Sequence, residues 1–165
     1  MTANIKFAQL RPDAMIPSKR QEDAGLDIYA CFDADWIEIL PHSSKLIPTG
    51  IASAFDHNWR LVFKERSSTG VKNIKVNAGI IDSGFRGEHM VCIYNGNDVP
   101  LYITKYMDGE QAPEAVDAIL YPYTKAIAQA LVEPSPDVNI EVIDIDDLRN
   151  IASERGEGMI GSSGK

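Results

Sequence analysis

Short stretches of the chain alternate apolar and polar residues, which is the pattern expected of half-buried β-strands. Each stretch stops at a Pro, Gly or Asn that favours a turn. Strands this short, with turn signals this close together, predict an all-β sandwich or barrel. The stretches are residues 4–10, 36–40, 45–47, 50–55, 60–63 and 90–94.

Later stretches follow other patterns. Residues 107–122 have Pro113 near a start, Glu114 in the first turn and apolar residues at helical spacing, which predicts a short helix. Residues 123–132 have helix propensity but could also alternate as a strand. Residues 138–145 alternate closely enough to predict a last strand.

A chain of 165 residues with 44% hydrophobic content is sufficient for one packed domain. We expect this domain to span residues 1–152. Residues 153–165 are rich in Gly and Ser and cannot bury enough apolar surface to fold alone, so they predict a mobile tail. Arg155 in such a tail is suited to a lid that closes over an anion.

The formal net charge of −8 argues against general nucleic-acid binding. Basic residues nevertheless gather between 60 and 76, where an anion could be met locally. No stretch approaches the length of a membrane span and no signal peptide is visible, which favours a soluble, cytoplasmic protein. Cys31 and Cys92 lack CxxC spacing and predict buried, reduced thiols, whereas His42, His57 and His89 are single and predict surface or turn positions.

Two acids stand out as candidates for chemistry. Asp82 follows two β-branched residues at the start of a glycine-rich turn, where desolvation can tune a general base, although Asp-Ser-Gly is also ordinary turn chemistry. Asp27 lies in an alternating stretch, and a solvated strand aspartate is the alternative interpretation. Residues 64–70 combine Arg66 with hydroxyls and a glycine, which suits phosphate binding as well as an ordinary polar loop.

Taken in order, five segments resemble the five motifs of the trimeric dUTP diphosphatases (dUTPases). The third, Ala-Gly-Ile-Ile-Asp-Ser-Gly-Phe-Arg-Gly, is the most specific. The segments are residues 23–30, 66–68, 78–87, 127–132 and 155–164.

This resemblance implies a jelly-roll-like β-barrel of the β-clip type that forms a homotrimer, with each active site assembled from three chains. It implies hydrolysis of dUTP to dUMP and pyrophosphate with Mg²⁺, which keeps uracil out of DNA. Asp82 would activate the attacking water. Gly79, Ile80 and Ile81 would present main-chain groups to uracil, and Asn77 belongs to the same substrate-binding segment.

The resemblance also assigns the sugar, phosphate and metal contacts. Phe85 stands where the family usually has Tyr, and its ring would pack on the deoxyribose. Asp27 would act on Mg²⁺ through the water shell of the ion. The phosphate contacts would come from Arg66, Ser67, Ser68, Gln129 and Arg155, with Ile160, Gly161 and Ser162 closing behind.

The chain departs from the family pattern in three places. The fourth segment has Tyr-Thr-Lys-Ala at residues 123–126, where a Gly-Asp-Arg-like start is usual. Met159-Ile160-Gly161 replaces the usual Gly-Phe-Gly, which removes an aromatic ring from the lid. Residues 107–122 look inserted, as in some phage enzymes, and are a candidate contact for a protein partner. One alternative function is a dUTP-gated interaction protein that uses this insertion. A less favoured alternative is a dCTP deaminase, whose family resembles this chain in its Asp-x-Gly-Phe-x-Gly turn but would need a glutamate at the position of Cys92.

Overall fold

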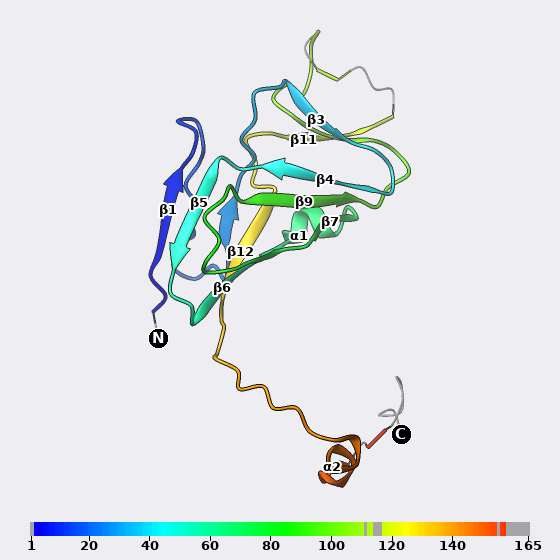
Figure 1. The fold of residues 1–165 in the computed structure, drawn as a ribbon. Coiled ribbons are helices and arrows are strands. Elements are labelled where there is room, and N and C mark those ends of the chain that lie inside the picture. The colour runs from blue at the N-terminus through cyan, green and yellow to red at the C-terminus, as the bar shows by residue number, and fades with distance from the viewer. Residues whose placement is uncertain (1, 111, 114–116, 155, 158–165) are drawn as a thin grey trace.

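The computed structural model describes residues 2–110, 112–113, 117–154 and 156–157. Within them, short strands wrap into one barrel-like body, which the chain leaves after its last strand (Figure 1). None of the helices in these ranges is long and apolar enough to cross a membrane. The elements are β1 (Ile5–Gln9), β2 (Leu26–Ile28), β3 (Trp36–Ile39), β4 (Ser43–Pro48), β5 (Ile51–Phe55), β6 (Trp59–Lys64), α1 (Ser67–Gly70), β7 (Ile74–Asn77), β8 (Ile80–Ile81), β9 (Met90–Asn95), β10 (Leu101–Thr104), β11 (Ile119–Pro122), β12 (Ala128–Pro134) and α2 (Ile145–Asn150).

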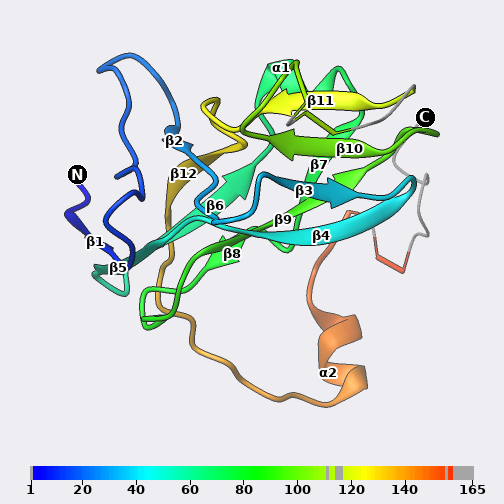
Figure 2. The ribbon, with the colours of Figure 1, turned by 90° about the horizontal axis from the view of Figure 1, so that it is seen from above.

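In the part of the chain that the structure describes, the strands form four small sheets with the orders β1-β5, β11-β10-β3, β2-β12-β6-β8 and β4-β9-β7. All pairings are antiparallel except that of β10 with β11. Seen from above, β3, β4, β9 and β10 run side by side across the body (Figure 2). Each of the six alternating stretches between residues 4 and 94 contains a strand, and the all-β prediction is confirmed.

The inward positions of these strands supply one hydrophobic core. Burial of these side chains is the main stabilising contribution to the fold, at about 25 cal/mol per Å² of apolar surface removed from water. The core also fixes the strands that carry the candidate site, because Ile28 of β2, Phe63 of β6 and Ala130 of β12 are all buried.

The helix expected in residues 107–122 is not what the described part of this stretch forms. Ile119 and Leu120 lie in β11 and pair with Leu101 and Tyr102 of β10. Pairing with a strand edge already present outweighs weak helix propensity. The described part of the connection between β10 and β11 projects from the body (Figure 1), while Glu114 and Val116 lie outside the described residues.

The ambiguous stretch 123–132 is a strand from Ala128 onward. β12 lies between β2 and β6, so ladder hydrogen bonds on both sides favour the extended conformation over helix. Residues 123–127 form the turn that leads into it.

The strand expected at residues 138–145 is absent. The Ser135 N–H still donates to the Asn58 carbonyl at 2.7 Å, but residues 136–144 pair with no strand in the part of the chain that the structure describes, and α2 begins at Ile145. Val138, Ile140 and Val142 are 82%, 85% and 93% exposed. The alternation is present in the sequence, but this segment leaves the body in both views and meets no strand edge of its own chain (Figures 1 and 2).

Candidate active site

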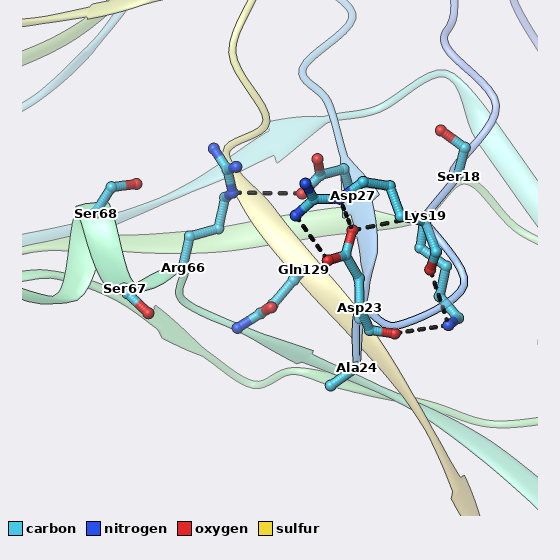
Figure 3. A pocket seen from close by; sticks show the side chains of 11 residues that line it. Ser18, Lys19, Asp23, Ala24, Asp27, Arg66, Ser67, Ser68 and Gln129 are labelled. Atoms are coloured by element: carbon cyan, nitrogen blue, oxygen red, sulfur yellow. Dashed lines mark hydrogen bonds and ion pairs between the residues drawn. The ribbon is translucent and has the colours of Figure 1, made fainter.

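Three of the predicted site segments meet because their strands are neighbours in one sheet. Gln129 of β12 is paired with Asp27 of β2 on one side and with Lys64 of β6 on the other. Arg66 follows two residues after Lys64. Segments separated by up to a hundred residues are therefore brought to one end of the sheet (Figure 3).

The chain turns sharply after β6 into the short helix α1, and Thr69 closes this turn. The Arg66 backbone N–H donates to Thr69 Oγ1 at 3.1 Å, and the Thr69 hydroxyl donates to the Arg66 carbonyl at 2.9 Å. Thr69 is buried, whereas Ser67 and Ser68 are exposed. The turn thus presents two hydroxyls beside the Arg66 side chain (Figure 3).

Arg66 is held in place by two partners. Its Nε lies 3.3 Å from Asp27 Oδ1, and its Nη1 donates to the Ala126 carbonyl at 3.4 Å. Gln129 Nε2 donates to the Glu65 carbonyl at 2.9 Å, which fixes the amide beside the guanidinium. A guanidinium has five N–H donors and an amide nitrogen has two, so both retain donors for an anion.

These side chains line a cavity of about 760 Å³. Its lining combines cations, hydroxyls and an amide with two carboxylates, a set that suits a phosphate ligand accompanied by a cation. The lining residues are Ser18, Lys19, Arg20, Asp23, Ala24, Gly25, Asp27, Arg66, Ser67, Ser68 and Gln129.

The loop before β2 also lines this cavity, which the sequence interpretation missed. Arg20 forms two hydrogen bonds of 2.9 Å with Asp23, and this contact lowers the pKa of the Asp23 carboxyl. Lys19 Nζ donates to the Asp23 carbonyl at 2.6 Å. The sequence signal for this part of the cavity was the pair of adjacent cations Lys19 and Arg20, shortly before the candidate segment of residues 23–30.

The Asp82 segment forms a second, smaller hollow of about 250 Å³. Its lining comprises Ile80, Ile81, Asp82, Phe85, Glu88 and Met90. Asp82 is exposed in the single chain, so the expected partial desolvation is not seen. The reason is that β8 has only two residues and ends at the edge of its sheet, where no further strand covers the turn.

The Asp82 turn itself is firmly built. The Phe85 N–H donates to the Asp82 carbonyl at 3.1 Å, and Arg86 Nη1 donates to the carbonyls of Ser83 at 2.6 Å and Phe85 at 3.0 Å. Gly79 is required where the segment approaches β6, because an added Cβ would lie 2.3 Å from the Phe63 carbonyl oxygen.

The two hollows share no lining residue and lie toward opposite ends of β6. Arg66 lies just beyond the last residue of β6, whereas Ile81, directly before Asp82, is paired with Leu61 near the start of that strand. The stretch from Leu61 to Arg66 spans roughly 17 Å at about 3.3 Å per residue. A single chain therefore does not bring Asp82 to the group formed by Arg66, Ser67 and Ser68.

Comparison with known proteins identifies the family. Residues 11–107, more than half of the chain, match the dUTPase family. The deoxyuridine 5'-triphosphate nucleotidohydrolase of Clostridioides difficile is 31% identical over 165 residues, covering 98% of this chain and 98% of that protein. The chain belongs to the dUTPase family.

Solved dUTPase structures have the same fold. The Staphylococcus bacteriophage 80alpha dUTPase with dUpNHpp has a TM-score of 0.74 at 20% identity and covers 99% of this chain and 100% of its own. A mutant dUTPase from phage phi11 of S. aureus, which coordinates a structural Mg(II) ion, has a TM-score of 0.68 at 18% identity and covers 86% and 97%. The all-β, jelly-roll-like dUTPase fold is confirmed.

The remaining candidate residues of this dUTPase family member differ in exposure. Asn77 is exposed, and its Nδ2 donates to Ser44 Oγ at 3.3 Å. Ile80 is exposed, whereas Ile81 is buried. The tail candidates lie outside the described residues: Arg155, Ile160, Gly161 and Ser162.

The burial of one histidine and one cysteine differs from the prediction made from the sequence. His89 is fully buried rather than at the surface, while His42 and His57 are exposed as predicted. Cys31 is a buried free thiol, but Cys92 is only half-buried. Cys92 lies on β9 opposite Leu46 and offers no carboxylate for a deaminase.

Proposed function

We propose that the chain hydrolyses dUTP to dUMP and pyrophosphate at a site built between copies of itself. Family membership supports the reaction. The observation that carries the proposal is the division of the site into two incomplete groups, one built around Arg66 and the other around Asp82, toward opposite ends of β6.

A homotrimer would join the two groups. A water activated by Asp82 must reach a phosphorus atom whose oxygens contact the Arg66 group, which a separation of roughly 17 Å along β6 within one chain does not allow. The exposed apolar residues after β12, with Val142 93% exposed, also favour a segment that is covered by another copy. We propose that Asp82 and Phe85 of one copy face the Arg66 cavity of a neighbour.

The Arg66 group is suited to hold the triphosphate. Ser67 and Ser68 would donate their hydroxyls to phosphate oxygens, and Arg66 would donate the N–H groups that Asp27 and Ala126 leave free. Gln129 would donate its second amide N–H. These donors would hold the anionic phosphate oxygens and leave the phosphorus open to attack.

The Asp82 group would supply the general base of the reaction and the contacts to the sugar and to the nucleobase. The Asp82 carboxylate would take a proton from the water as its oxygen attacks the α-phosphorus, with pyrophosphate as the leaving group. Phe85, 44% exposed, would pack on the deoxyribose. The main-chain groups of Gly79, Ile80 and Ile81 would contact uracil. Asn77 would border the same subsite.

The donor set fits a magnesium ion that is bound mainly by the substrate. Asp23 and Asp27 are the carboxylates of the cavity, each already paired with an arginine. In the described residues no cluster of three or more acidic, His or Cys side chains could form a protein cage. Asp27 would therefore bind through water, and the ion would neutralise charge that develops on the phosphate oxygens.

The tail would complete the site. Arg155 would reach the terminal phosphate, and Ile160, Gly161 and Ser162 would close behind it. Because Ile160 lacks an aromatic face, closure should be weaker by about 1 kcal/mol than with a stacking ring. Residues 153–165 would then act as a lid on the domain formed by residues 1–152.

The inserted connection supports a second role as a contact for a protein partner. Residues 107–110 are exposed, and the described part of the connection projects from the body (Figure 1). It is attached between β10 and β11 and contributes no side chain to either hollow in its described part.

Pyrophosphate release tests the proposed reaction. With dUTP and Mg²⁺ the native protein should turn over, with dCTP, dTTP and UTP far slower, and Asp82→Asn should be inactive while still binding dUTP. Binding of dUTP without turnover by the native protein would contradict hydrolysis and favour the interaction role.

A further inference from the structure

His89 is a buried polar ring that the proposed chemistry does not use. It is 0% exposed and lies directly before β9. Its Nε2 lies 3.0 Å from Ser53 Oγ, while its Nδ1 has no hydrogen-bond partner among the described residues. A buried polar atom without a partner costs free energy that an aliphatic side chain would not. A feature other than core packing is needed to explain an imidazole here.

The neighbours of His89 are aromatic rings. Phe7 and Phe63 approach it edge-on, with centroids 6.4 Å and 5.8 Å away and interplanar angles of 77° and 65°. Phe85 differs, because its ring is nearly parallel to the imidazole at 22°, with centroids 6.2 Å apart. His89 thus has two edge contacts that fix its plane and one offset face that it presents to Phe85.

Phe85 combines this ring contact with exposure at the Asp82 hollow. The residue is 44% exposed and borders that hollow. Its ring also lies close to Gly87, where an added Cβ would be 2.6 Å from the ring Cζ. The ring thus contacts the imidazole and lies against Gly87, and part of Phe85 stays open to a ligand.

Ser53 connects this support to the turn that carries Asp82. Its hydroxyl contacts His89, and its carbonyl accepts a hydrogen bond of 3.4 Å from Arg86 Nη1, which also binds the Ser83 and Phe85 carbonyls. One residue of β5 thus positions both the imidazole and the turn.

We propose that His89 is a positioning residue for sugar recognition: its imidazole holds the Phe85 ring at the tilt that admits a deoxyribose and excludes a ribose. This proposal rests on the proposed function, in which Phe85 contacts the sugar. An aliphatic residue at position 89 would fill the core but would present no flat face, so the Phe85 ring would tilt and a 2′-hydroxyl would meet less resistance.

The test compares His89→Leu with His89→Phe, which retains a ring, and with Ile103→Ala, which weakens the core on β10 away from both hollows. We expect the ratio of kcat/KM for dUTP over UTP to fall about tenfold in His89→Leu. It should be largely restored in His89→Phe and unchanged in Ile103→Ala. Ser53→Ala, which keeps the imidazole but frees it to tilt, should give a smaller fall and serves if His89→Leu does not fold.

A second measurement is independent of turnover. Phe85 ring resonances, assigned by their loss in Phe85→Leu, should move toward unstacked chemical shifts in His89→Leu but not in Ile103→Ala. Unchanged selectivity together with unchanged Phe85 shifts in His89→Leu would overturn the proposal. If the native protein fails to hydrolyse dUTP, the proposed function fails, and the Phe85 shifts still decide whether His89 positions the ring.

Discussion

Arg66 and Asp27 form the most informative side-chain pair of the candidate site. Both are partly exposed, at 33% and 38% of their side chains, so their ion pair at 3.3 Å contributes little to stability. Its importance lies in orientation, since it fixes the guanidinium beside the cavity. Under the proposed function, the second carboxylate oxygen of Asp27 would serve the cation that accompanies the phosphates.

Asp27→Asn should raise the Mg²⁺ concentration that gives half-maximal turnover by about tenfold or more, as expected for a group that acts through the water shell of a metal. Magnesium titrations of the steady-state rate would measure this. Asp98→Asn, a change at an exposed loop acid, is the control and should match the native protein. A native-like magnesium requirement in Asp27→Asn would remove Asp27 from the metal site.

His89 should also give the protein a specific pH dependence of stability. Desolvation lowers its pKa from 6.5 to about 4, so the folded state favours the neutral ring. The resulting stabilisation is fully present above pH 6.5 and is lost as the pH falls toward 4. Between pH 7 and pH 5 the loss is about 2 kcal/mol. Urea unfolding at a fixed protein concentration should show this slope in the native protein and a smaller one in His89→Leu; equal slopes would argue against a buried neutral ring.

The contact between β8 and β6 places the nucleobase segment, and Gly79 makes it possible. Gly79→Ala would put a Cβ 2.3 Å from the Phe63 carbonyl oxygen, so β8 must move away. We expect a destabilisation of about 1–3 kcal/mol and loss of turnover. Gly84→Ala in the same segment is the matched control, because its Cβ would meet nothing within 4 Å. Thermal unfolding and pyrophosphate release measure both; similar behaviour of the two variants would contradict the close approach.

Prediction from the sequence succeeded where each strand found its partner within the chain. The alternation at residues 50–55 and 90–94 became β5 and β9. It failed at residues 138–145, where the pattern is equally regular but no strand edge of the same chain is available, and at Ile119 and Leu120, where pairing with β10 overrode helix propensity. Pairing depends on contacts distant in sequence, which local patterns do not contain.

The residues of the candidate site, like the strands, were predicted only in part. Asp27, Arg66 and Gln129 were identified from their segments and do converge, whereas the contribution of Lys19 and Arg20 was missed, and Asp23 was included in its segment without a role. The loop that carries these three residues has no periodic pattern that would place it beside strands distant in sequence. The burial of His89 was also missed, because a single histidine gives no periodic signal.

The inserted connection should be separable from catalysis. Removing residues 107–122 entirely would also remove β11, whose Tyr121 is buried and donates to the Ala126 carbonyl at 2.6 Å. Replacing only residues 107–117 by a Gly/Ser linker of about eight residues spans the return from β10 to β11. We expect turnover within about twofold of native. Loss of turnover in a folded variant, judged by its unfolding temperature, would place the insertion in the catalytic machinery.

Assembly decides whether the two halves of the site ever meet. A homotrimer should sediment at about three times the 18.2 kDa of one chain. It should bury the exposed apolar residues that follow β12, so truncation after Pro134 is expected to weaken assembly and turnover together. Analytical ultracentrifugation of both proteins measures this; a native monomer with full activity would contradict a shared site.

Complementation between two inactive variants tests the shared site most directly. Asp82→Asn and Arg66→Gln each lack one half of the site and should be inactive alone. If Asp82 of one copy serves the Arg66 cavity of its neighbour, trimers refolded from equal amounts of the two chains should recover about one quarter of native turnover, because that fraction of neighbouring pairs is intact at random assembly. Mixed trimers that form but remain inactive would contradict a site built between copies.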